Sequence, residues 1–316
     1  MKGFISPGLH PFYKLLLLLV FMLAGICVGM FVVLLGLKFG YGLSLTDITM
    51  LTQNPQAYPD GRSAMVFYQV ITHLFMFTIG PLVFLSASEP SVKQYLFSKK
   101  NHVPLLVISA LLLLVIMPAN SWLINWNAKM HLPEAFEGME LWMKQKEDQL
   151  GELTRYLTQF NSVGQMLIGL VAFALIPAIG EELVFRGIIQ KNLVRWLRNE
   201  HVAIWVTAIL FGAIHVQFFG FFPRVVLGAI FGYLYAWSRN LWVPIAGHFM
   251  NNGVTVFLLY LQQNKMIEAN VESTDAMPWY FGLASLAASL MVLVYLQKHY
   301  KAIPENPDAR LTENRF

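Results

Sequence analysis

The chain has 316 residues, of which 56% are hydrophobic and 13% are charged. Because a soluble domain carries roughly 25% charged residues, this composition argues against a soluble fold and predicts an all-α polytopic membrane protein in the lipid bilayer. The net charge of +4 comes without a dense basic cluster, so we expect no nucleic-acid partner. The single cysteine excludes an internal disulfide and a cysteine-based metal site.

Long apolar runs recur along the sequence. A membrane-spanning helix needs roughly 20 apolar residues. Eight candidate runs lie at residues 15–38, 65–87, 103–125, 163–186, 202–220, 222–238, 241–262 and 278–297. The first run exceeds the roughly 7–15 residues of a signal-peptide core, so we expect it to be a retained span.

The basic residues between these runs predict the orientation. With eight spans, all of the segments that carry them fall on one side of the membrane, and the acidic loops fall on the other. The basic residues are Lys2, Lys14, Lys93, Lys99, Lys100, Lys191, Arg195, Arg198, Arg239, Lys298, Lys301, Arg310 and Arg315. We therefore expect an integral multi-pass protein of a prokaryotic cytoplasmic membrane, with both termini in the cytoplasm.

Three parts follow from this arrangement. Residues 1–160 hold three spans and an extracytoplasmic amphipathic segment, 161–263 form the core that carries the motifs described next, and 264–316 hold the last span and a cytoplasmic tail. Within residues 126–160, apolar side chains recur at helical spacing, which predicts a helix on the outer surface or over the bundle. The alternative is a solvated connector without a chemical role.

The fourth run contains GEELVFRG at residues 180–187, with three ionisable groups among apolar neighbours. An ionised group in hydrocarbon costs a few kcal/mol or more unless it is paired, hydrated or neutralised. Glu182 and Arg186 are four residues apart, which favours an ion pair on one helix face. Glu181 lies about 100° around the helix from Glu182. It is the acid without a local partner, and therefore the candidate to take and give a proton.

Two later motifs add polar groups to spans five and seven. FGAIH places Phe211 and His215 on one helix face, and HFMNN places His248 and Asn252 on another. At about 1.5 Å of rise per residue, Glu181, His248 and Asn252 are expected roughly 10–15 Å from the cytoplasmic side and His215 roughly 20 Å. These groups can form one cluster with Glu182.

Such a cluster has the parts for hydrolysis. Glu181 can activate a water, His215 can share that task or protonate a leaving amine, and His248 and Asn252 can donate hydrogen bonds to an oxyanion. Glu181, His215 and His248 are also candidate ligands for a divalent metal such as zinc, although the HExxH signature is absent. The cofactor is therefore unknown: none, or a divalent metal.

Each motif taken alone also has a simpler interpretation. Glu182 and Arg186 can be a structural ion pair, His215 a packing residue, and His248 with Asn252 an interhelical polar clamp. His73 in the second run has no polar neighbour at helical spacing and is interpreted as structural.

The ordered set EELVFR, FGAIH and HFMNN matches the patterns EExxxR, FxxxH and HxxxN. Over residues 163–262 the chain thereby resembles the CPBP family of CAAX-processing and bacteriocin-processing membrane proteases, which includes the type II CAAX prenyl endopeptidases. The resemblance implies an eight-helix intramembrane endopeptidase with a cavity open toward the cytoplasm. It implies Glu181 as the base assisted by His215, His248 with Asn252 on the oxyanion side, and Glu182 with Arg186 as structural support.

The expected activity is hydrolysis of a peptide bond in a membrane-associated protein or peptide, with or without a metal. The alternative is a non-catalytic membrane protein that binds peptides, confers bacteriocin self-immunity or acts as a scaffold. A proton-coupled transporter is a third reading, disfavoured because no inverted repeat is visible.

Overall fold

The computed structural model describes residues 4–6, 8–100 and 102–304, and within these ranges the regular structure is helical apart from one isolated bridge, Phe97 to Asn240. The α-helices are α1 (Pro11–Tyr41), α2 (Leu45–Gln53), α3 (Gly61–His73), α4 (Gly80–Ser88), α5 (Val92–Leu96), α6 (Val103–Val115), α7 (Met117–Ala128), α8 (Glu137–Leu157), α9 (Val163–Gly169), α10 (Ile176–Glu182), α11 (Lys191–Leu197), α12 (Glu200–Ala213), α13 (Phe221–Ser238), α14 (Trp242–Gln263) and α15 (Trp279–Ala302). Three π-helical segments are η2 (Leu74–Ile79), η4 (Leu170–Leu175) and η5 (Leu183–Gln190), and three 3₁₀ turns are η1 (Pro55–Ala57), η3 (Glu134–Phe136) and η6 (Phe218–Gly220). The predicted all-α class is confirmed.

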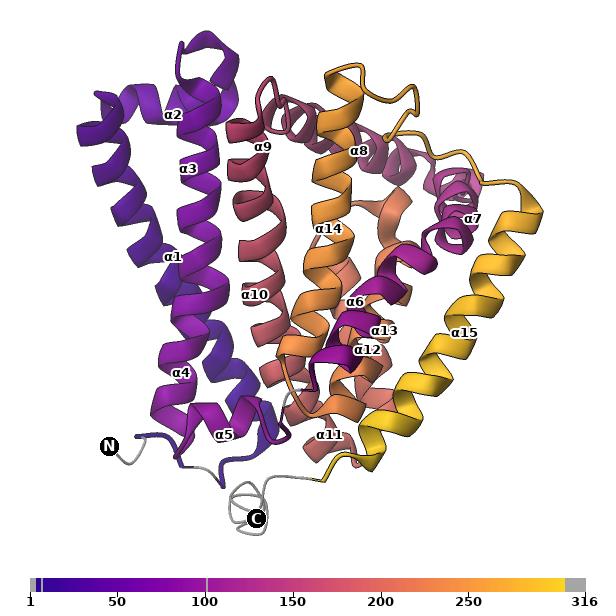
Figure 1. Ribbon diagram of the computed structural model, residues 1–316. Helices are drawn as coiled ribbons and strands as arrows, with labels where there is room; N and C mark the ends of the chain where they lie inside the picture. The colour runs from indigo at the N-terminus through magenta and orange to yellow at the C-terminus, as the bar shows by residue number, and fades with distance from the viewer. Residues whose placement is uncertain (1–3, 7, 101, 305–316) are drawn as a thin grey trace.

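The long helices pack side by side as a bundle (Figure 1). Helix α1 begins and α15 ends at the same end of the bundle, and the short helix α5 also lies there. Helices α2 and α8 lie at the opposite end. The basic segments around α5 and α11 are therefore grouped at one end, as the predicted orientation requires, whereas which end faces the cytoplasm stays a prediction.

Five described helices or continuous helical segments are long and apolar enough to cross a membrane, and a bent pair brings the number to six. The five are Pro11–Tyr41, Gly61–Ser88, Val163–Leu197, Phe218–Ser238 and Trp279–Ala302. The chain is a multi-pass membrane protein on this basis, but the predicted count of eight spans is not confirmed. Helix α14 does not qualify because polar residues such as His248 and Asn252 lie along it.

Two predicted spans differ from the observed helices. The run 103–125 is a pair of helices, α6 and α7, bent by 44°, because Pro118 cannot donate a helical hydrogen bond. The run 202–220 is wrong as one span: α12 ends at Ala213, and Val216 has a φ of 51°, which a continuing helix cannot accommodate. A tight turn at residues 214–217 therefore leads from α12 into η6, which is followed directly by α13.

The fourth predicted span is longer than expected. Helical structure continues from Val163 to Leu197 through α9, η4, α10, η5 and α11. Glu181 lies 16 residues before Leu197, so the rise of about 1.5 Å per residue places it about 24 Å from that end rather than the predicted 10–15 Å. The acid is therefore near the middle of the helical segment.

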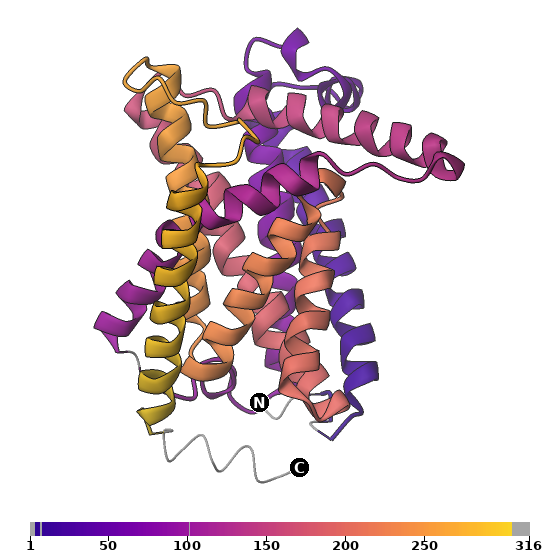
Figure 2. The ribbon, with the colours of Figure 1, turned by 90° about the vertical axis from the view of Figure 1, so that its right-hand side faces the viewer.

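The amphipathic helix predicted within residues 126–160 is present as α8, although Phe160 lies beyond its end. Figure 2 shows α8 running across one end of the bundle and extending past its side. The ring of Trp142 packs against Phe218 at 5.5 Å between centroids, beside the turn between α12 and α13. Phe136, Met139 and Leu141 are exposed. The helix thus covers the α12–α13 turn with one part and presents apolar side chains at the edge of the bundle.

Candidate active site

The ion pair expected within α10 and η5 is present and buried. Arg186 Nη1 donates to Glu182 Oε1 at 2.7 Å, and both side chains are fully buried. Arg186 Nη2 also donates to the carbonyl of Gly228 in α13 at 2.8 Å. The pair therefore joins the Glu182 helix to α13 as well as neutralising charge within its own helix, which a buried ion pair needs if it is to persist.

His248 completes this group from α14. Its Nδ1 lies 2.8 Å from Glu182 Oε1, and its exposed fraction is 4%. Because an ionised carboxylate can only accept, Nδ1 carries the proton and Nε2 faces the rest of the cluster. Glu182 therefore accepts from both Arg186 and His248, and it fixes the ring orientation of His248 in addition to the support expected of it.

Aromatic rings enclose the charged pair. The Arg186 guanidinium lies over Phe211 at 4.6 Å and over Phe231 at 5.3 Å from the ring centroids. The His248 ring stacks on Phe231 at 5.2 Å with an interplanar angle of 12°. These contacts remove water from Glu182 and Arg186 and add cation–π attraction, so the orientation of His248 is set by packing as well as by its hydrogen bond.

Glu181 contacts side chains of two other helices, whereas the ion pair within its own helix belongs to Glu182, as the spacing predicts. Glu181 Oε1 lies 3.3 Å from His73 Nε2 in α3, and its Oε2 lies 3.9 Å from His248 Nε2. Oε2 is buried without a hydrogen-bond partner among the described residues. The carboxylate is therefore held on one oxygen and open on the other.

His73 is the site residue that the sequence interpretation missed. The sequence interpretation makes it structural because no acidic residue follows it in the second run, but its partner lies on α10. The ring also stacks on Phe77 at 4.6 Å. A titratable side chain inside a membrane span is costly without a partner, and that cost is the signal that could have identified it.

Gly180 brings these two helices close enough for the contact. A Cβ at this position would lie 2.8 Å from Phe77 Cβ, 2.9 Å from Thr78 Oγ1 and 3.1 Å from His73 Cε1. Small residues allow helices in membranes to approach closely. The glycine directly before Glu181 is therefore what lets His73 reach the carboxylate.

His215 lies just beyond the end of α12. Its Nδ1 donates to the carbonyl of Phe211 at 2.8 Å, so its two ring nitrogens have different roles. Its ring packs edge-on against Phe211 at 5.1 Å, and the Phe211 ring in turn contacts that of His248. Among the described ion pairs His215 makes none with either glutamate, but it is near enough for its charge to interact with that of Glu181.

Asn252 follows His248 by one turn of α14, as the spacing predicts, but among the described residues its hydrogen bonds do not join it to the carboxylates. Its Nδ2 donates to the carbonyl of Phe173 at 3.4 Å. That carbonyl lacks its usual helical donor because residue 177 is proline. Asn252 also borders a pocket of about 220 Å³ together with Phe173 and Leu157. This pocket lies toward α8, the end of the bundle opposite the α1 start, and the expected opening toward the cytoplasm stays a prediction.

Three π-helical segments flank these residues, namely η2 after His73, η4 before α10 and η5 after Glu182. Segments of this kind are rare and are frequent at functional sites, because they displace side chains from regular helical positions. Pro81 and Pro177 lie two residues after the ends of η2 and η4. The missing N–H of each proline explains why the regular hydrogen-bond pattern changes there.

The candidate metal ligands are not gathered into a ready-made metal centre. Within the part of the chain that the structure describes, no group of three or more His, Cys, Asp or Glu side chains is arranged to hold a metal ion. His248 Nδ1 is engaged by Glu182, and Glu181 Oε1 faces His73. The metal role considered for Glu181, His215 and His248 stays a prediction.

Comparison with known proteins is informative for the segment that carries these residues. Residues 163–254 match the family described as Type II CAAX prenyl endopeptidase Rce1-like. Two proteins of Bacillus subtilis (strain 168) are similar over 89 residues: "Uncharacterized protein YpbD", at 27% identity over 27% of this chain, and "Putative membrane peptidase YdiL", at 29% identity over 28%. The aligned region covers 42% and 36% of those relatives, respectively. No solved structure shows a significant match.

The resemblance to the CPBP family is thereby confirmed for the motif-bearing segment, which matches the Rce1-like family. All six residues expected to act in the site lie within residues 163–254. His73 lies outside them. The matched segment thus holds both carboxylates, and the N-terminal half of the chain supplies a contact that the family motifs do not include.

Proposed function

We propose that the chain is an intramembrane endopeptidase that hydrolyses a peptide bond in a membrane-associated protein or peptide. The observation that carries the proposal is the state of the Glu181 carboxylate. One oxygen is held by His73, and the other is buried, has no hydrogen-bond partner among the described residues and lies 3.9 Å from His248 Nε2. A water bound between Oε2 and His248 would have the proton acceptor that general-base catalysis requires.

In the proposed reaction Glu181 takes a proton from this water, and the resulting hydroxide attacks the carbonyl carbon of the substrate. The tetrahedral intermediate then collapses as the C–N bond breaks. The proton held by Glu181 passes to the leaving amine, directly or through His215, so that protons balance over the cycle. General acid–base catalysis of this kind typically contributes about 10²–10⁴-fold to the rate.

The charges of the cluster are consistent with a site that holds and releases one proton. Two carboxylates, Glu181 and Glu182, face one guanidinium, Arg186, which leaves one negative charge in a buried site. A further proton, shared among Glu181, His73 and His248, would make the site neutral and remove most of its desolvation cost. A protonated His248 would also present Nε2–H to the developing oxyanion, since Glu182 accepts from its Nδ1.

Asn252 is proposed to donate the second hydrogen bond to the oxyanion. Its amide is half-buried, borders the pocket of about 220 Å³, and is held in place by Phe173 and by the neighbouring Asn251. The pocket would receive one side chain of the substrate, because its walls include Leu157, Phe173 and Val256.

The deciding experiment compares the termini of membrane proteins in cells carrying wild type, Glu181→Gln or Glu268→Gln. Glu181→Gln keeps the size of the side chain but removes the base. Glu268→Gln makes the same chemical change in an exposed loop. We expect at least one protein terminus, read by mass spectrometry, to disappear in the Glu181→Gln cells and to persist in the Glu268→Gln cells.

Equal abundance of the three proteins in the membrane has to be verified by quantitative immunoblotting. If the Glu181→Gln cells show the same termini as wild type at equal abundance, Glu181 is not the base of a protease. The non-catalytic alternative, in which the same polar cluster binds a peptide, would then take its place.

A further inference from the structure

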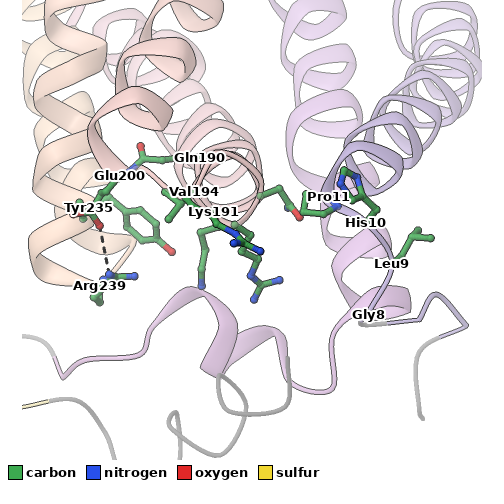
Figure 3. A pocket seen from close by; sticks show the side chains of 14 residues that line it. Gly8, Leu9, His10, Pro11, Gln190, Lys191, Val194, Glu200, Tyr235 and Arg239 are labelled. Carbon is green, nitrogen blue, oxygen red and sulfur yellow. Dashed lines mark hydrogen bonds and ion pairs between the residues drawn. The ribbon is translucent and has the colours of Figure 1, made fainter.

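A second pocket lies far from the Glu181 cluster, at the end of the bundle where α1 begins and where α11 and α13 end. Its volume is about 650 Å³, within the usual range for small-molecule sites of about 300–1,000 Å³. Figure 3 shows its lining in two groups, with His10 and Pro11 of α1 on one side and Lys191, Tyr235 and Arg239 on the other. The walls therefore come from helices that are distant in the sequence.

The lining of this pocket is strongly basic. Lys191, Arg195, Arg198 and Arg239 contribute four cationic side chains, and Glu200 contributes the one carboxylate among the lining residues. Glu200 Oε1 lies 3.4 Å from Arg239 Nη2. Lys191 donates to the carbonyl of Tyr95, and Arg195 lies over the Tyr95 ring. Arg198 and Arg239 against Glu200 still leave an excess of positive charge in a concave site, where low-dielectric walls concentrate the field. Such a site attracts an anion.

Two of these arginines occupy backbone positions that do not suit arginine. Arg198 ends α11 with a φ of 53°, and Arg239 ends α13 with a φ of 49°. This left-handed conformation at a helix end favours glycine or asparagine. A basic residue one position earlier would complement the helix dipole equally well without the strained backbone. That both arginines line the same pocket is therefore an independent indication of a ligand.

Aromatic side chains place the pocket at the membrane surface. Trp196 packs edge-on against His10 at 5.8 Å and against Phe12 at 5.6 Å, which joins α11 to the start of α1. Phe12, Tyr13 and Trp196 are exposed. Aromatic rings gather where a protein crosses from hydrocarbon to headgroups, and basic pockets between helices at that level suit phosphorylated headgroups.

We propose that this pocket binds a phosphate-bearing anion, supplied by a phospholipid headgroup or by a soluble phosphate ester. Arg198 and Arg239 reach the phosphate from the ends of two different helices, and the planar guanidinium group suits bidentate binding of phosphate oxygens. The bound anion would join the start of α1 to α11 and α13, and would therefore stabilise the native bundle.

The test uses the full chain in nanodiscs of phosphatidylcholine, with or without added phosphatidylglycerol, and in detergent with glycerol phosphate. The double variant Arg198→Asn, Arg239→Asn removes two charges, and asparagine suits the left-handed backbone, so we expect it to fold. The matched control is Lys298→Gln, Lys301→Gln, which removes two exposed charges from the end of α15 at the same end of the bundle.

The readouts are the thermal unfolding temperature and, by native mass spectrometry, the lipid that remains bound. For wild type and for the control we expect phosphatidylglycerol to raise the unfolding temperature and to remain bound. For the double variant we expect an affinity about thirty-fold weaker, and for Arg198→Asn alone about fivefold weaker. The single variant leaves the Arg239–Glu200 pair intact.

The two sources of phosphate give different patterns. If phosphatidylglycerol stabilises the protein and glycerol phosphate does not, the ligand is a lipid headgroup. If both stabilise wild type and neither stabilises the double variant, the pocket takes the soluble ester as well. A double variant that keeps the full response, or a control that loses it equally, would overturn the proposal.

Discussion

Glu181 and Glu182 are consecutive in the chain, but their carboxylates lie in different surroundings. Glu182 is fully buried and accepts from Arg186 and His248 at 2.7 and 2.8 Å. Glu181 is 8% exposed and has only a longer contact of 3.3 Å, from Oε1 to His73. Oε2 of each glutamate is buried without a hydrogen bond among the described residues, but Oε2 of Glu181 lies 3.9 Å from His248 Nε2. We call these the closed half and the open half of the cluster.

The difference shows how one buried site divides structural and chemical roles. The closed half has its charges balanced and its geometry fixed by aromatic packing, so it supports the bundle and orients His248. In the open half the carboxylate has one longer hydrogen bond in place of two short ones, so more of its hydrogen-bonding capacity is unused, which costs stability in a buried site. A reactive site often contains a group that lowers stability, held in place by a rigid neighbour. Glu181 beside the closed half fits this description.

The largest expected effect comes from breaking the closed half. Arg186→Ala leaves Glu182 as an uncompensated buried charge, which should lower the free energy of unfolding by about 3–5 kcal/mol. Thermal unfolding in detergent, followed by tryptophan fluorescence, measures the loss. The matched control is Arg155→Ala, because Arg155 makes an exposed ion pair with Glu272 at 3.7 Å, and such pairs are worth about 0–1 kcal/mol. Unfolding of Arg186→Ala at the wild-type temperature would show that the pair is not needed for the fold.

The next effect should appear in activity when the open half loses its histidine. His73→Leu removes the group that holds Glu181 Oε1, and loss of an orienting partner typically costs about 10–100-fold in activity. The rate of substrate processing should fall by that factor, and the unfolding temperature should fall by less than in Arg186→Ala, because Glu181 loses one long hydrogen bond whereas Glu182 loses its ion pair.

His73→Gln tests the same contact by conservative replacement, because its amide can still donate to Glu181. We expect it to recover part of the lost rate, and His299→Leu, on the exposed end of α15, to have no effect. If His73→Leu processes substrate at the wild-type rate, the contact between α3 and α10 has no part in the chemistry.

A smaller effect is expected from separating the two helices. Gly180→Ala places a Cβ within 3.1 Å of Phe77, Thr78 and His73. Overpacking of this kind costs about 1–3 kcal/mol, and the shift of α10 away from η2 should also slow processing. Gly138→Ala is the control, since a Cβ there meets nothing within 4 Å. Equal unfolding temperatures for the two alanine variants would contradict the close approach.

The smallest effect on stability is expected at Glu140, a carboxylate outside the cluster. It accepts several hydrogen bonds without being deeply buried, so it tests whether the number of hydrogen bonds or the burial of the group determines the stability lost. Glu140 of α8 accepts from Lys144 at 2.6 Å, from His131 at 2.9 Å and from the Leu132 amide at 2.8 Å. The Lys144 hydrogen bond and then that of His131 lower the pKa of Glu140 to about 2 from 4.5. Its contribution to stability is therefore fully present above pH 4.5 and is lost as the pH falls through about 2.

Glu140→Gln should release only the segment before α8, because the group is at the surface and water replaces the lost bonds. Hydrogen exchange at Leu132 should be faster in the variant than in wild type at neutral pH, and the two should converge as the pH falls to about 2. The global unfolding temperature should not change. A large drop in that temperature would mean that the number of hydrogen bonds a carboxylate accepts, rather than its burial, determines how much it contributes to stability.

Local spacing predicted the contacts that lie within one helix. The four-residue interval fixed the Glu182–Arg186 pair and placed Asn252 one turn beyond His248, because an α-helix sets those distances without help from the rest of the molecule. The apolar runs likewise identified most of the long helices. The short α12 and the bend between α6 and α7 were missed because a turn and a proline interrupt sequences that remain apolar.

Contacts between helices could not be predicted in the same way. His73 and Glu181 are 108 residues apart, and their contact depends on how closely α3 and α10 approach at Gly180. The division into a closed and an open half likewise depends on which side chains α13 and α14 place against Glu182. Interhelical packing sets these distances, and no periodicity in a single helix records it.

The sequence by itself determined that the chain is an all-α membrane protein and that three motifs bring carboxylates, imidazoles and an amide into its helices. It did so because hydropathy and helical periodicity are local properties. Only the tertiary structure decided which imidazole holds Glu181, that Glu182 orients His248, and that basic side chains from separate helices line one pocket. Those relations depend on the packing of side chains between helices, which many sequences with the same hydropathy pattern would arrange differently.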